Sequence, residues 1–218
     1  MRTLTASTIP LPQDSPRHDP PADRAAPVTA PSSQGSNHSP RTTAGADVQF
    51  EEDHPRDGLY GPMHWLDDRG ITALLAPYVS EGWGGDDYAR IGGLEGADAR
   101  RLLSLLPRLA RRDRQNNAPT IATLLRAAAS VDGLTLEGYM IRAPRRDERV
   151  SIDTVCVPES AISAITGSPA PEQACPSYLH WLALARVLAV PADTPAPDEI
   201  RFLTRTGSSE RWWWAWWD

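Results

Sequence analysis

Apolar residues recur at helical spacing in the middle third of the chain. After a pair of aspartates suited to cap a helix, one apolar stripe predicts a helix that Pro77 should kink or shorten. A second stripe follows Asp98, a suitable N-cap, and a third begins beside Pro119, a residue favoured in the first turn. The three predicted buried faces are Ile71, Leu74, Leu75, Tyr78 and Val79, then Leu102, Leu105, Leu106 and Leu109, then Ile121, Leu124, Leu125 and Ala128.

Two later stretches are rich in β-forming residues. LTLEGYMI (134–141) and VSIDTVCV (150–157) are joined by a polar, charged connection and predict two strands. ESAISAIT then predicts a short helix closed by Gly167. Ser177 caps YLHWLALARVLAV, which is apolar on nearly every side, so we expect this helix to be the central buried one.

The end of the chain carries five of the eight tryptophans. IRFLTRT (200–206) and RWWWAWW (211–217) flank the turn-like GSSE, and this pattern predicts a β-hairpin. We expect Thr206 to pair with Arg211, because a slip by one residue would set Arg205 against Arg211, two like charges. The predicted core face then carries Ile200, Phe202 and Thr204 opposite Trp217, Ala215 and Trp213, and the second face carries Arg201, Leu203 and Arg205 opposite Trp216, Trp214 and Trp212.

The second face of this hairpin is the candidate binding surface, formed by Arg201, Arg205, Trp212, Trp214 and Trp216. Two interpretations stay open: a helix covers the tryptophans while the arginines extend to the rim, or the face is exposed. An exposed face would offer anchors to a protein partner or a stacking platform to single-stranded nucleic acid. Membrane binding is not expected, because no basic amphipathic helix accompanies the tryptophans.

Residues 1–57 are expected to form a disordered leader. The first 46 residues include eight prolines and almost no large apolar side chains, so burial cannot offset the entropy of ordering them. Residues 47–57 continue it as an acidic segment. The expected fold class is therefore α+β: a single domain, residues 58–218, in which helices pack a mostly antiparallel four-stranded sheet and the chain ends in a tryptophan-rich β-hairpin.

All 22 basic residues are arginine, and lysine is absent. A GC-rich bacterial genome explains this composition most simply. It also excludes a lysine Schiff base, a Ser–Lys dyad and a phosphate-binding loop of the GxxxxGK[ST] type. The chain has only two cysteines, and their spacing does not match a disulfide framework. It also lacks an apolar run typical of a signal peptide or a membrane span, and together these features favour a cytoplasmic protein.

Basic charge is concentrated in the middle of the chain, although the whole chain has a net charge of −6. Residues 99–149 carry a net charge of +6, whereas residues 150–218 carry −4. The candidate patch for an anionic partner is Arg101, Arg108, Arg111 and Arg112, in a segment that Pro107 is expected to break. An arginine-rich solvent face satisfied by ion pairs is one interpretation, and a contact with nucleic acid is the other.

No motif for catalysis or metal binding is present: GxSxG, HExxH and paired cysteines are all missing. Cys156, Cys175 and His180 do not have zinc-site spacing, and His180 is expected to be a satisfied core residue. Glu137 and Asp153 lie on adjacent predicted strands where they could hold Mg²⁺, although such pairs are usually solvated. No metal and no cofactor is expected.

The glycine-rich stretch EGWGGDDYARIGGLEG, residues 81–96, lacks the G-x-G-x-x-G spacing of dinucleotide-binding loops. It therefore predicts an irregular loop, with a ligand-binding loop as the alternative.

The sequence thus favours a non-enzymatic intracellular bacterial protein that binds another protein through the Arg/Trp face of its hairpin. The alternative is a nucleic-acid-associated accessory protein that combines the arginine-rich segment 100–114 with the tryptophan platform. A hydrolase-type enzyme without a recognisable motif is the third hypothesis.

Overall fold

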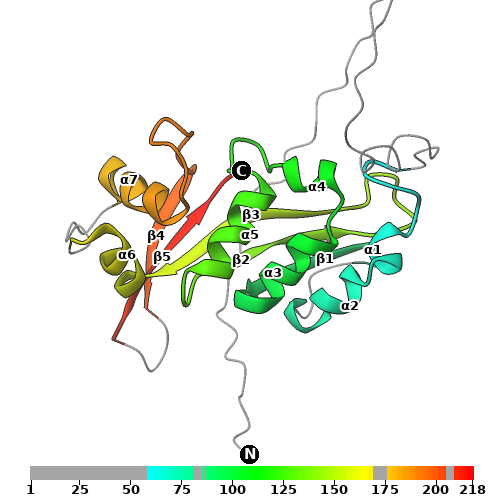
Figure 1. Ribbon diagram of the computed structural model, residues 1–218, viewed down its shortest axis with the longest axis horizontal. Helices are drawn as coiled ribbons and strands as arrows, with labels where there is room; N and C mark the ends of the chain where they lie inside the picture. Colours follow the sequence, from blue (N-terminus) through cyan, green and yellow to red (C-terminus); the bar gives the residue numbers. More distant parts are fainter. Residues whose placement is uncertain (1–57, 81–84, 86, 169–175, 205–208) are drawn as a thin grey trace, which may run out of the picture. The chain divides into compact units, whose positions relative to one another are not determined.

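The computed structural model describes residues 58–80, 85, 87–168, 176–204 and 209–218. All of them fall within one unit, Asp47–Asp218. They form helices and a five-stranded antiparallel sheet (Figure 1). The expected α+β class is confirmed, whereas the expected number of strands was one too few. The expected leader, residues 1–57, lies outside the described residues.

The strands lie in the order β1-β2-β3-β5-β4, and each neighbouring pair is antiparallel. Their bounds are β1 Tyr88–Leu94, β2 Thr135–Ile141, β3 Arg149–Pro158, β4 Glu199–Thr204 and β5 Arg211–Trp216. The helices are α1 Trp65–Asp68, α2 Ile71–Leu75, the 3₁₀ turn η1 Ala76–Tyr78, α3 Gly96–Leu105, α4 Arg108–Arg112, α5 Ile121–Ser130, α6 Glu159–Thr166 and α7 Tyr178–Val187. None of the described helices has the length and apolar character needed to cross a membrane.

The fifth strand is β1, which occupies the glycine-rich stretch where we predicted an irregular loop. Ala89 and Ile91 are buried and alternate with the partly exposed Tyr88 and Arg90. The register with β2 then shifts before Leu94, through a pair of glycines of which one has φ 80°. Because this bulge interrupts the alternation after four residues, the strand was hidden in the sequence.

A second bulge lies at the centre of the sheet, between β2 and β3. Glu137 pairs with Thr154 whereas Gly138 pairs with Ile152, so Asp153 is the extra residue of β3. A β-carbon on Gly138 would lie 2.0 Å from a backbone carbonyl oxygen of β3, and only glycine fits there.

Prolines end helices as predicted. The helix α2 ends before Pro77, which lies in the 3₁₀ turn, and Pro107 separates α3 from α4. The expected cap was wrong: Asp98 lies in the first turn of α3, and its carboxylate accepts a 2.7 Å hydrogen bond from the Tyr78 hydroxyl. Burial of this hydroxyl, together with that bond, raises the pKa of Tyr78 to about 12. The contact ties the turn after α2 to the start of α3.

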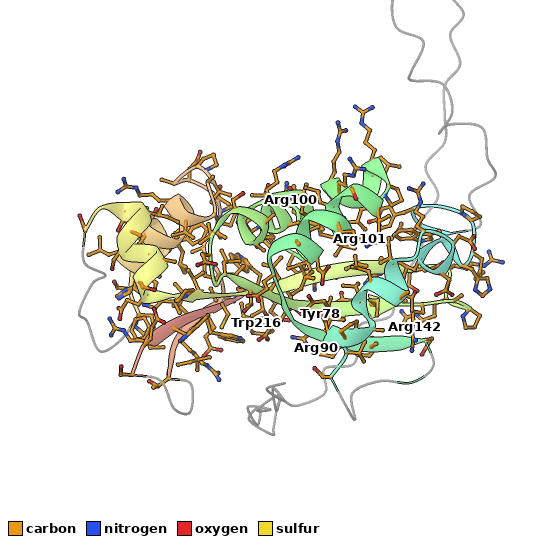
Figure 2. The ribbon with its side chains drawn as sticks, turned by 60° about the horizontal axis from the view of Figure 1, so that its bottom comes forward. Tyr78, Arg90, Arg100, Arg101, Arg142 and Trp216 are labelled. Atoms are coloured by element: carbon orange, nitrogen blue, oxygen red, sulfur yellow. The ribbon has the colours of Figure 1, made fainter. Side chains whose placement is uncertain are left out.

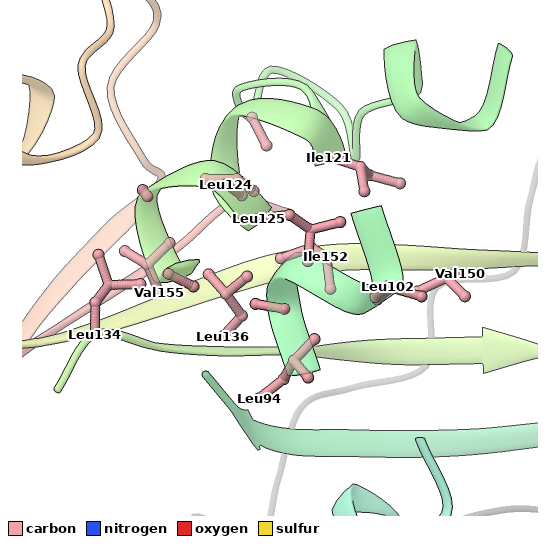
Figure 3. Close-up of a cluster of buried hydrophobic side chains, with 14 of the residues drawn as sticks. Leu94, Leu102, Ile121, Leu124, Leu125, Leu134, Leu136, Val150, Ile152 and Val155 are labelled. Atoms are coloured by element: carbon pink, nitrogen blue, oxygen red, sulfur yellow. The ribbon is translucent and has the colours of Figure 1, made fainter. Parts of the chain in front are cut away.

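Helices α3 and α5 lie side by side over one face of the sheet, which we call the helix face (Figures 1 and 3). The Thr120 hydroxyl caps α5 by accepting a hydrogen bond from the Thr123 backbone N–H, and the predicted buried face of this helix is confirmed. The side chains that fill this core include Leu94, Leu102, Ile121, Leu124, Leu125, Leu134, Leu136, Val150, Ile152 and Val155.

The helix α7 packs on the same face at the β4–β5 end of the sheet rather than at its centre. His180 is fully buried as expected, and its ring lies 5.0 Å from that of Phe202 and 4.8 Å from that of Trp213. It is only partly satisfied, because its Nε2 has no hydrogen-bond partner among the described residues. Its Nδ1 accepts a hydrogen bond from the backbone N–H of the N-cap. Tyr178 and Leu179 are 61% and 54% exposed, so the expectation of a wholly buried helix was wrong.

The hairpin of β4 and β5 is present, but its predicted register was wrong by two residues. Thr204 pairs with Arg211, and Phe202 lies opposite Trp213 instead of Ala215. This register sets the rings of Phe202 and Trp213 5.6 Å apart, an aromatic pair that buries more apolar surface than the predicted pair. A shift by two keeps every side chain on its predicted face, because strand side chains alternate with a period of two.

Candidate interaction surface

Strand alternation sorts the five terminal tryptophans between the two faces of the sheet. Trp213 and Trp217 lie on the helix face and are fully buried. The other three lie on the opposite face, as predicted, and we call it the outer face. The register places on the outer face Tyr88 and Arg90 of β1, Thr135, Glu137 and Tyr139 of β2, Thr154 and Cys156 of β3, Glu199, Arg201 and Leu203 of β4, and Trp212, Trp214 and Trp216 of β5.

Trp212 is not part of an exposed surface, although we predicted it as a binding residue. It is only 8% exposed and lies between Pro158 and Leu203 of the neighbouring strands. The tip of its ring is also close to Gly133, whose added β-carbon would lie 3.9 Å from it. Its neighbours within and beside the sheet therefore bury it.

Trp214 and Trp216 form a partly exposed pair on the outer face. Their ring centroids are 6.4 Å apart and their planes differ by only 20°. They occupy alternate positions of β5, so both side chains project from the same face of the strand. One strand thus presents two stacked indoles together.

Arg201 lies against this pair, as the cation–π prediction required, but over Trp214 instead of Trp216. Its guanidinium carbon is 5.4 Å from the Trp214 ring centroid. Both oxygens of Glu199 accept hydrogen bonds from the same guanidinium, at 2.5 and 2.8 Å. The residue two positions earlier on the same strand therefore orients the arginine against the indole. Arg205, the other predicted arginine, lies outside the described residues.

A second aromatic pair lies at the opposite end of the outer face and was missed by the sequence analysis. The rings of Tyr88 and Tyr139 stack at 5.6 Å, and the guanidinium of Arg149 lies 5.8 Å from the Tyr139 ring. The Tyr139 hydroxyl donates to Oε1 of Gln115, which comes from the connection between α4 and α5. The hidden strand β1 and the distant Gln115 explain why periodicity alone did not find this group.

Between the two aromatic pairs lies an ion pair. Arg90 donates to both oxygens of the largely buried Asp153, at 2.8 and 3.3 Å, and the Thr154 hydroxyl donates to the same carboxylate at 2.7 Å. Burial disfavours the charged Arg90, but Asp153 outweighs it and the pKa of the guanidinium is raised. Asp153 is therefore engaged and unsuited to the Mg²⁺ site considered with Glu137. Within the described ranges, no three His, Cys, Asp or Glu side chains group as metal ligands, and Cys175 lies outside those ranges.

The candidate arginine patch lies on the helices and has two parts. Arg111 donates to the carbonyls of Leu106 and Ser104, which lie at the carboxyl end of α3 where helical acceptors are lacking. Arg111 therefore has a structural role. The remaining members are exposed and form no ion pair with a described carboxylate: Arg101, Arg108 and Arg112.

Arg100 and Arg101 lie on the helices in Figure 2, whereas Arg90 and Trp216 lie at the strands. The arginine patch and the tryptophan pair are therefore separate surfaces. The structure does not join them into the single nucleic-acid platform that the sequence suggested as an alternative.

A polar hollow of about 330 Å³ adjoins Tyr139. Tyr60 lies in the wall of this hollow. Burial is the larger cause that raises the pKa of its hydroxyl, and a hydrogen bond to the Asp113 carboxylate is the second cause. The charged groups around the hollow have opposite signs and partly neutralise one another. Its lining residues are Leu59, Tyr60, Asp113, Arg114, Gln115, Asn116, Tyr139 and Arg149.

Comparison with protein-family models, with curated proteins and with solved structures found no match to this chain. Its function is therefore argued from the geometry of these surfaces.

Proposed function

We propose that this chain is a cytoplasmic bacterial protein that acts without catalysis, by binding another protein through the outer face of its sheet. The observation that carries the proposal is the partly exposed, parallel pair of Trp214 and Trp216 with Arg201 held beside it. Tryptophan and arginine dominate the energetic centres of protein interfaces.

The rigidity of this group also favours recognition. The two indoles already stack, and Arg201 already lies over Trp214 and bonds to Glu199, so this arrangement needs less ordering when a partner binds. A surface that is ordered beforehand gives more affinity per contact than a mobile one.

The electrostatics of the outer face favour a protein over a nucleic acid. Arg90 is paired with Asp153 and Arg201 with Glu199, so carboxylates of the same face already neutralise both guanidiniums. Affinity for nucleic acid comes largely from cations that neutralise phosphates. Stacking on the tryptophans alone would lack that contribution.

The test is partner capture with paired variants. Cross-linking in cells of the source organism, followed by mass spectrometry, identifies the partner, and calorimetry with the purified partner measures its affinity. We expect the double variant Trp214→Ala, Trp216→Ala to bind at least tenfold more weakly. The matched control is Tyr178→Ala, Leu179→Ala, which removes exposed apolar surface from α7 and should leave affinity unchanged. Equal affinity of the wild type and the tryptophan variant would sink the proposal.

A second candidate function rests on Arg101, Arg108 and Arg112, which are exposed and unpaired among the described side chains. Such a cluster suits an anionic partner such as nucleic acid, now through the helices alone. Binding of a short DNA or RNA duplex should then weaken steeply with salt, and replacing the three arginines by alanine should flatten that slope. The absence of binding at low salt would remove this candidate.

A further inference from the structure

Trp216 lies in a row of side chains that crosses four strands of the outer face. The register aligns Glu199 of β4, Trp216 of β5, Thr154 of β3 and Glu137 of β2. Adjacent strands lie about 4.8 Å apart, so the backbone of Glu199 lies one strand away from that of Trp216 and the backbone of Glu137 lies two strands away on the other side. The indole of Trp216 is thus flanked by acidic groups.

Trp214, by contrast, lies in a row that contains a cation. Its neighbour on β4 is Arg201, and its neighbour on β3 is Cys156. The guanidinium of Arg201 already occupies a position over the Trp214 ring. The chain therefore demonstrates the chemistry that these indoles accept, a planar cation held by a carboxylate.

The wider surroundings of Trp216 are also acidic. Asp198 and Asp218 meet where β4 begins and β5 ends, and the Asp218 backbone N–H donates to the Asp198 carboxylate. With Glu137, Asp153 and Glu199 these make five carboxylates, against the three guanidiniums of Arg90, Arg149 and Arg201. An incoming cation would reduce this excess of negative charge, whereas a phosphate would increase it.

We infer that the outer face binds a basic segment of its partner, with an arginine side chain stacked on Trp216 between Glu199 and Glu137. Arginine suits the position better than lysine because its planar guanidinium both stacks on an indole and donates to carboxylates. The inference rests on the proposed function, since it names the chemistry of the partner at that surface.

The experiment uses the full chain and a capped peptide with two arginines, Ac-Gly-Arg-Gly-Arg-Gly-NH₂. Indole N–H signals in NMR spectra follow its binding at low salt, and peptides with lysine, with neutral citrulline or with glutamate replace the arginines as comparisons. We expect the arginine peptide to shift the signals of Trp214 and Trp216 first, the lysine peptide to bind more weakly, and the citrulline and glutamate peptides not to bind.

The variants separate stacking from general attraction to an acidic protein. Trp216→Ala should weaken binding of the arginine peptide about two- to fivefold, the effect of one exposed cation–π contact, and Trp216→Phe should weaken it less. Glu137→Gln should also weaken binding, whereas Asp68→Asn removes the same charge from α1 and should have no effect. Unchanged affinity in Trp216→Ala, or equal losses in Glu137→Gln and Asp68→Asn, would overturn the inference.

Failure of this inference can be told from failure of the proposed function. If the double tryptophan variant loses the cellular partner but the arginine peptide does not bind, the protein-binding function stands and the basic segment is wrong. If the peptide binds at Trp216 while the partner is retained by the double variant, the proposed function is wrong and the cation site stands. Binding of an oligonucleotide at Trp216 in place of the peptide would contradict both.

Discussion

The two faces of β5 use the same residue type for opposite purposes. Trp213 and Trp217 face the helices and are completely buried, whereas Trp214 and Trp216, one position away, remain partly exposed. Trp217 meets Trp181 edge to face at 6.2 Å, and Trp213 lies under His180. On the outer face the guanidinium of Arg201 lies over the Trp214 ring, and the Trp216 ring stacks beside that of Trp214. The period of the strand therefore places the two fully buried indoles, Trp213 and Trp217, on one face and the partly exposed pair on the other, where Trp212 is buried by its neighbours.

The two faces also stabilise their buried carboxylates differently. Glu148, just before β3, is 1% exposed and faces α1, where its Oε1 accepts a 3.0 Å hydrogen bond from the Leu66 backbone N–H. Its carboxylate forms no ion pair with any described residue. On the outer face, both carboxylate oxygens of Asp153 accept hydrogen bonds from the Arg90 guanidinium. Backbone N–H groups thus stabilise the Glu148 carboxyl under the helices, whereas a guanidinium stabilises the Asp153 carboxylate on the outer face.

The largest effect is expected for Trp213→Ala, which empties the space beneath α7. Truncating a large buried aromatic costs about 3–5 kcal/mol of the free energy of unfolding, measurable by urea denaturation. Trp213→Phe is the control: the buried indole N–H has no hydrogen-bond partner in the described part of the chain, so losing it should cost little. A cost below about 1 kcal/mol for Trp213→Ala would contradict this packing.

A smaller effect is expected for Trp214→Ala, on the other face of the same strand. The indole is partly exposed and its main partner is Arg201, so we expect a loss of about 1–2 kcal/mol in the same urea experiment. Trp213 and Trp214 share the strand and the residue type, and differences in β-propensity therefore cancel. Equal, large losses at both positions would show that the two faces are covered alike, and the outer face would cease to be a binding surface.

Periodicity alone predicted much of the fold. The buried face of α5, the strands β2 and β3 and the division of the tryptophans between two faces all follow from regular spacing of apolar side chains. These elements were predictable because their packing repeats the local pattern. The same holds for Pro107, whose effect on a helix is local. Of the two other predicted buried faces, Ile71, Leu75, Leu102 and Leu106 are buried, whereas Val79 and Leu109 are 38% and 41% exposed.

Irregular elements could not be predicted in this way. In β1 the alternation of Ala89 and Ile91 is cut short by a bulge, and glycines there resemble a loop. The hairpin register depends on Phe202 meeting Trp213 beneath α7, which is a tertiary contact absent from the two strand sequences. The partner of Arg90 was equally invisible, because Asp153 lies 63 residues along the chain and is turned toward it by the bulge at Gly138.

The smallest effect is expected from the protonation of Glu148, and it distinguishes the two carboxylates by pH. Burial raises the pKa of Glu148 above its usual value of 4.5, although backbone N–H groups of α1 oppose the shift, and its Oε2 has no hydrogen-bond partner among the described residues. The folded state therefore holds this proton to higher pH than the unfolded chain does. The proton on Glu148 therefore stabilises the folded state, and this contribution is complete only below pH 4.5, the pKa of the unfolded chain. As the pH rises from there through the raised pKa of the folded state, the wild type loses this stability.

Glu148→Gln removes this titration while keeping an oxygen that can accept from Leu66. Urea unfolding of both proteins between about pH 4 and about pH 8 should show wild-type stability falling relative to the variant as the pH rises. The slope cannot exceed about 1.4 kcal/mol per pH unit, the limit for one proton. A stability difference that stays constant with pH would mean that Glu148 ionises as easily in the folded as in the unfolded chain. The contrast between a carboxylate held by backbone dipoles and one held by Arg90 would then have no energetic consequence.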